Sequence, residues 1–70
     1  MMRVFFVFED PLDETGLNLS YIDVPTQNPT KAIEWVENAA DSGELWAQLY
    51  PDEQEHPFRL IPGKMMYQEI

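Results

Sequence analysis

The chain has 70 residues, a formal net charge of -9 and no cysteine. These values exclude a disulfide framework and a thiolate zinc site, and they disfavour direct binding to nucleic acid or to an anionic membrane, since both carry charge of the same sign. The length predicts a single domain, residues 1–70. The longest apolar run, Val4 to Phe8, is too short to cross a bilayer and there is no leader pattern, so we expect a soluble, cytoplasmic protein.

The first two predicted elements are strands. Residues 3–8 are β-branched and aromatic on both faces, which is typical of a central strand covered on both sides. Residues 9–16 hold four acids, a proline and a glycine and predict a loop. Residues 17–24 alternate and predict a second strand in a long-looped hairpin with the first, its apolar side being formed by Leu17, Leu19 and Tyr21.

The segment from Asn28 to Gly43 predicts one amphipathic helix. Asn28 is suited to cap the first turn, Pro29 is tolerated at the helix entry, and Gly43 supplies a left-handed stop. At about 100° per residue the apolar side chains share one face, which we expect to pack on a sheet. That face consists of Ala32, Ile33, Trp35, Val36, Ala39 and Ala40.

Residues 44–50 alternate again and predict a third strand, with Leu45, Ala47 and Leu49 on one face and Trp46, Gln48 and Tyr50 on the other. After an acidic loop at 51–57, residues 58–61 predict a fourth strand, and Pro62-Gly63 predicts a type II turn. Residues 64–70 either return as a short edge strand or stay partly loose.

The predicted fold class is α+β. It is a small single-layer antiparallel or mixed sheet of four to five strands with one helix packed on one face, in the chain order β-β-α-β-β(-β). A right-handed crossover places the first strand centrally, in the order 2-1-3-4.

One helix covers only one face of such a sheet, so the other face is expected to be open. The side chains expected on it are Phe5, Val7, Trp46, Tyr50 and Ile61. An apolar patch of this kind marks a binding surface for another protein or for a second copy of the chain. The alternative is that Met65, Met66 and Tyr67 fold back over the patch and complete a small core.

No motif predicts catalysis or a cofactor, so we expect neither. His56, the only histidine, lies in an acidic loop without a recognisable catalytic partner, and neither Ser20 nor Ser42 lies in a nucleophile motif. The acidic loops lack the ligand spacing and central glycine of an EF-hand, and the four bases do not form a basic patch. A small enzyme or a metal-dependent regulator built on these loops remains a third alternative.

The excess of acids predicts a function in binding. On the helix the acids form a row, and the two loops extend it if they fold to the same side. The predicted acidic partner-binding residues are Glu34, Glu37 and Asp41 on the helix, Asp10, Asp13 and Glu14 in the first loop, and Asp52, Glu53 and Glu55 in the second. Such a surface can occupy a groove that a basic protein uses for phosphates.

The first functional hypothesis is therefore an inhibitor that blocks a nucleic-acid-binding protein by charge mimicry. In composition and size the chain resembles phage-encoded anti-defence proteins of the anti-CRISPR or DNA-mimic type. The alternative is an assembly module that binds a partner, or itself as a homodimer, through the aromatic sheet face, with Trp46 and Tyr50 as anchors.

Overall fold

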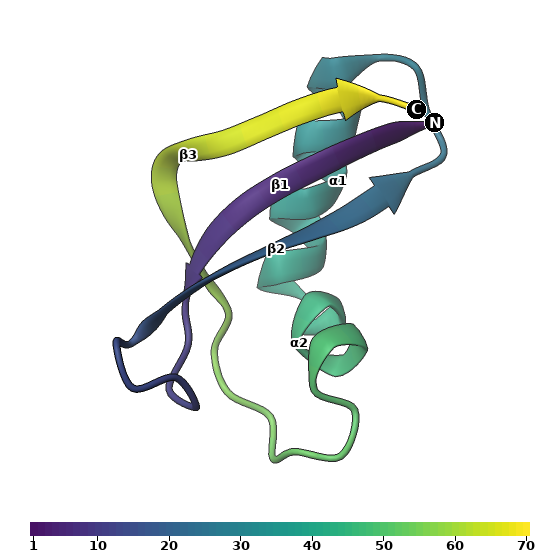
Figure 1. The fold of residues 1–70 in the computed structure, drawn as a ribbon. Helices are drawn as coiled ribbons and strands as arrows, with labels where there is room; N and C mark the ends of the chain where they lie inside the picture. The colour runs from purple at the N-terminus through teal and green to yellow at the C-terminus, as the bar shows by residue number, and fades with distance from the viewer.

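The computed structural model describes residues 1–70 as a three-stranded sheet with two helices on one face (Figure 1). The elements are β1 (Met2–Glu9), β2 (Leu17–Val24), α1 (Pro29–Asp41), α2 (Glu44–Leu49) and β3 (Arg59–Glu69). The sheet order is β2-β1-β3, and both neighbouring pairs are antiparallel. The fold is thus β-β-α-α-β, and the prediction of four to five strands with one helix was wrong.

β1 is the central strand, as its apolar composition predicted. Its even-numbered side chains, Met2, Val4, Phe6 and Phe8, are buried at 0–3% exposure, whereas the odd-numbered positions are more exposed. A strand whose successive side chains point to opposite faces delivers one complete apolar set to the core in this way. The helices cover that face alone.

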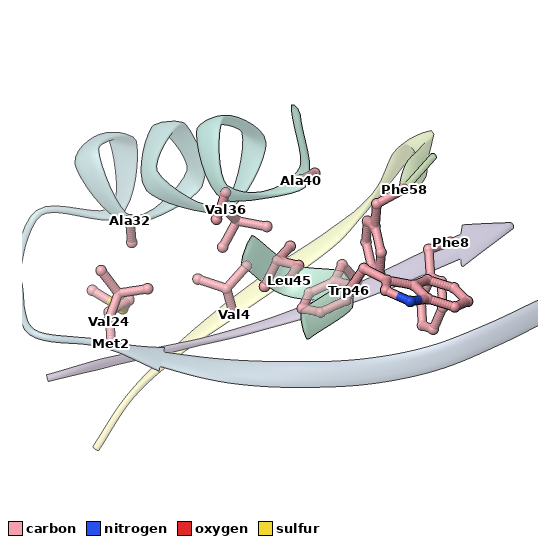
Figure 2. Packing of buried hydrophobic residues seen from close by; sticks show 12 residues of the cluster. Met2, Val4, Phe8, Val24, Ala32, Val36, Ala40, Leu45, Trp46 and Phe58 are labelled. Carbon is pink, nitrogen blue, oxygen red and sulfur yellow. The ribbon is translucent and has the colours of Figure 1, made fainter. Parts of the chain in front are cut away.

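α1 forms where the amphipathic pattern predicted it. The side chain of Asn28 accepts hydrogen bonds from the backbone N–H groups of Thr30 at 3.0 Å and Lys31 at 3.4 Å, so it caps the first turn. The helix rests on the sheet through Ala32, Val36, Ala39 and Ala40, all buried. Figure 2 shows Ala32 facing Met2 and Val24, and Val36 facing Val4, across the layer.

The segment after Gly43 was predicted as a strand and is a helix, α2. Leu45, Trp46 and Leu49 recur at helical spacing, and the first two are buried at 1% exposure while Leu49 packs against the core. Over six residues an apolar run fits a period of two and a period of 3.6 almost equally well. Gly43, with φ +83°, turns the chain from α1 into α2 in the left-handed conformation that glycine adopts readily.

The predicted fourth strand, the type II turn and the tail merge into one edge strand, β3. Its register against β1 shifts between Phe6 and Phe8, so Pro62-Gly63 forms a bulge instead of a chain reversal. Pro62 has no amide hydrogen to donate to a ladder, and a bulge on an edge strand tolerates that loss. Just before β3, Phe58 stacks on Phe8 with ring centroids 4.5 Å apart.

Candidate functional site

The exposed face of α1 carries Glu34, Glu37 and Asp41, as predicted from the sequence. Neighbours three or four residues apart on a helix lie about 5–6 Å apart between Cβ atoms, so the three carboxylates form a row. The structure contains two ion pairs, Arg3–Asp23 and Arg59–Glu9, and neither involves this row. No ion pair within the chain therefore neutralises the row, and Arg59 is the base that lines the same depression as Glu37 and Asp41.

The row continues at the junction between α1 and α2. Glu44, Glu53 and Glu55 line one surface depression around Gly43, and Asp41 and Glu55 line its neighbour. The loop at 51–57 thus folds to the side of the helices and brings its acids to those of α1. We call the set Glu34, Glu37, Asp41, Glu44, Glu53 and Glu55 the acidic surface.

The first loop was predicted to extend the acidic row, but it does not contribute to the acidic surface. Asp10 is fully buried, and Asp13 uses its carboxylate to accept hydrogen bonds from the backbone and hydroxyl of Thr15 at 2.9 and 2.7 Å. Glu14 in the first loop and Asp52 in the second are exposed but line none of the depressions around the junction. The carboxylates of Asp10 and Asp13 therefore stabilise the conformation of the first loop.

Asp10 is the acceptor of a buried hydrogen-bond network. Its carboxylate accepts from the hydroxyl of Tyr50, from the backbone N–H of Leu12 at 2.9 Å and from the amide of Asn18 at 3.1 Å. Burial acts to raise the pKa of Asp10, but these hydrogen bonds together outweigh it and lower that pKa below its ordinary value. The network ties the hairpin loop to the end of α2.

The sheet face opposite the helices is open, and Figure 1 views it with α1 behind the strands. Of the five residues predicted there, Phe5 and Val7 occupy odd positions of β1 and lie on it. Trp46 and Tyr50 do not, because α2 carries them to the helix side, where their rings pack 4.8 Å apart. Ile61 lies in the bulge of β3, beside Ile33 of α1.

Sequence reasoning missed four members of this open face. The register sets Phe5 opposite Tyr21 and Met66, and Val7 opposite Leu19, so these side chains emerge on the same side. They are strongly exposed, with Leu17 at 46%, Leu19 at 64%, Tyr21 at 50% and Met66 at 73%. We call Phe5, Val7, Leu17, Leu19, Tyr21 and Met66 the open apolar face.

The sequence signal for the orientation of β2, its polar side, was misleading. Asn18 and Ser20 alternate with the apolar residues of β2, and polar residues normally face water. Here they face the helix side together with Ile22 and Val24, and Leu17, Leu19 and Tyr21 face outward. The alternative that residues 65–67 cover the open face was also wrong, because they are part of β3 itself, with Met65 against the core and Met66 pointing outward.

The remaining chemistry of the chain is sparse. His56 is half-buried and packs edge-on against Trp46 with ring centroids 5.0 Å apart. No three histidine, aspartate or glutamate side chains are grouped as metal ligands. Neither helix has the length and apolarity needed to span a bilayer.

Comparison with protein-family models, curated proteins and solved structures finds no match for this chain.

Proposed function

We propose that the protein is an acidic inhibitor that binds a basic, nucleic-acid-binding protein in the cytoplasm and occupies its phosphate-binding groove. One observation carries this proposal: six exposed or partly exposed carboxylates from α1, α2 and the following loop converge on one side of the molecule without an intramolecular ion pair. Some phages encode inhibitors of host defence that act in this way.

The scaffold favours charge mimicry because it fixes the carboxylates before binding. Glu34, Glu37 and Asp41 project from a capped helix whose opposite face is buried, and Glu44 begins the helix that follows. A duplex presents negative charge about every 1.7 Å along its axis, and a basic groove evolved for it attracts other closely spaced anions. Fixed charges also speed the encounter with such a groove.

The test compares two variants that remove the same charge from different places. E37Q/D41N removes two negative charges from the acidic surface, and E14Q/E69Q removes two exposed negative charges outside it. Both variants therefore change the net charge from -9 to -7. Tagged proteins capture a partner from a host lysate, and the bound protein is eluted with salt from about 50 to 500 mM and competed with duplex DNA.

We expect the partner to be a nucleic-acid-binding protein that DNA displaces. Because each exposed charge pair contributes about 0.2–1 kcal/mol, E37Q/D41N should weaken binding by roughly 2- to 30-fold, whereas E14Q/E69Q should change it little. Equal losses in both variants would mean that only net charge matters. Binding that is insensitive to salt would contradict the proposal.

A second candidate function is favoured by the open apolar face. Leu19 and Met66 are more exposed than not, on a rigid sheet where large apolar side chains are normally covered. On this hypothesis the face is the contact surface of an assembly module, and the acids keep the rest of the molecule in solution.

A further inference from the structure

We infer that the occupant of the open apolar face is a second copy of this chain, packed sheet to sheet with its strands running in the opposite direction. This inference rests on the second candidate function and specifies its partner. It is independent of the acidic surface, which lies on the helices and the loop after them.

The first support is the inverted pattern of residues 17–21 of β2, since Ile22 and Val24 at the other end of the strand face the core in the ordinary way. Asn18 and Ser20 lie on the helix side, while Leu17, Leu19 and Tyr21 point to solvent. An isolated three-stranded sheet with one wet face is stable with the opposite alternation. The sequence of residues 17–21 is therefore that of a strand segment with apolar cover on the side that the helices leave open.

The second support is the distribution of charge. The strand positions of this face carry Arg3, Asp23, Glu9 and Arg59. Two of the four bases and two of the thirteen acids thus lie here, so the face has a net charge of 0 and the rest of the chain carries -9. Two copies can bring these faces together while their acidic surfaces point away from each other.

The third support is the order of charges along β1. Arg3 lies near one end of the face and Glu9 at the other, with Phe5 and Val7 between them. A twofold axis parallel to the strands would place Arg3 against Arg3 of the partner subunit. A twofold axis across the strands instead places Arg3 against Glu9 of the partner subunit, twice, and Phe5 against Val7 of the partner subunit. Opposite charges select the second arrangement, in which Arg3 also keeps its ion pair with Asp23 and Glu9 its ion pair with Arg59.

The area of the open apolar face sets the expected affinity of the dimer. Strands of eight residues, at about 3.4 Å per residue and about 4.8 Å apart, give a three-stranded face of roughly 27 by 14 Å. Two such faces bury on the order of 1,000 Å² in total, close to the lower limit of specific interfaces at about 1,200 Å². We expect a reversible dimer with a dissociation constant in roughly the micromolar range.

Sedimentation equilibrium of the full chain, from about 1 μM to 1 mM and at about 50 and 500 mM salt, tests the dimer. We expect a shift from the monomer mass of 8.2 kDa towards twice that value. Salt should strengthen the dimer, because the repulsion between two chains that each carry -9 outweighs the two Arg3–Glu9 attractions that salt also screens. This is opposite to the salt effect expected at the acidic surface, so failure of either proposal can be told from failure of the other.

Two matched substitutions test the face. Leu19 and Leu12 are both exposed leucines, at 64% and 48%, but Leu12 lies in the loop between β1 and β2. We expect L19K to weaken dimerisation at least tenfold and L12K to leave it unchanged, with both variants keeping the circular dichroism spectrum of the parent. Equal behaviour of the two variants would refute the face as the interface.

A charge exchange tests the orientation. R3E and E9R each place like charges opposite one another in a homodimer, so each alone should dimerise less well than the parent. When the two are mixed, Glu at position 3 of the R3E chain meets Arg at position 9 of the E9R chain at one end. At the other end the native Glu9 of the R3E chain meets the native Arg3 of the E9R chain, so a mixed dimer should form. A chain that stays monomeric at 1 mM overturns the inference, as does a salt-resistant partner of another sequence that is lost in L19K. A mixture that shows no recovery overturns the proposed orientation.

Discussion

Replacing Tyr50 by phenylalanine removes one hydroxyl from the buried network around Asp10 and should destabilise the fold. Asp10 is 0% exposed, and its carboxylate keeps two of its three donors in this variant. A hydrogen bond to a charged group contributes about 1.5–3 kcal/mol to stability. For 70 residues the whole free energy of unfolding is roughly 3.5–10 kcal/mol, so one hydroxyl accounts for a large share of it.

Urea denaturation at pH 7 followed by circular dichroism measures this loss. Y50F should lower the free energy of unfolding by about 1.5–3 kcal/mol. On the usual scale of about 4–8 °C per kcal/mol for domains of this size, Tm should fall by at least about 6 °C. Y67F is the matched control, because Tyr67 is 53% exposed, and it should unfold like the parent.

The same urea denaturation at acid pH tests whether the hydrogen bond from Tyr50 depends on the ionised carboxylate of Asp10. The pKa of Asp10 is lowered in the folded protein, so its contribution to stability is present above the ordinary aspartate pKa of about 3.9 and is lost as the pH falls through the folded value. A neutral hydrogen bond contributes only about 0.5–1.5 kcal/mol, so the difference between parent and Y50F should shrink by about half at low pH. Equal stability of Y50F and the parent at pH 7 would refute the reasoning, as would a difference that does not change with pH.

Three further predictions concern the fold. The pKa of Tyr50 is raised by its hydrogen bond to Asp10 and by burial. The stability that this hydroxyl contributes should therefore persist below the ordinary tyrosine pKa of about 10 and be lost as the pH rises through the folded value. Urea denaturation should show the stability difference between the parent and Y50F declining over that pH range. N28A removes the acceptor of the first two amides of α1 and should cost about 1 kcal/mol in urea denaturation, while N28D, which keeps an acceptor, should cost much less. G43A and G16A both place alanine at positive φ and should each cost about 1–2 kcal/mol. The contact of a new Cβ at Gly43 with the carboxylate of Glu55 adds little, since that exposed side chain can rotate away, so E55A should not rescue G43A.

If both surfaces act as proposed, they serve different purposes on opposite sides of one small sheet. The open apolar face would join two chains, and each acidic surface would remain free to bind. Two acidic surfaces on one dimer would also raise the apparent affinity for a partner that has two basic grooves within reach.

The sequence alone determined the elements whose signals are local and long. The cap at Asn28, the thirteen-residue amphipathic pattern of α1 and the dense β-branched and aromatic run of β1 each predicted the observed structure. The acidic row Glu34, Glu37 and Asp41 was predictable for the same reason, because the period of a helix fixes which side chains share a face.

Tertiary structure decided the rest. Residues 44–49 fit either period over so few positions, and they are helical because Leu45 and Trp46 then reach the core from the same side as α1. That choice took Trp46 and Tyr50 away from the open face and added Glu44 to the acidic surface. The register between β1 and β2 decided that Leu19 and Tyr21 face outward, since a shift of one residue exchanges the two faces of a strand. Alternation shows that a strand has two faces, but only the packed sheet determines which of them a helix covers.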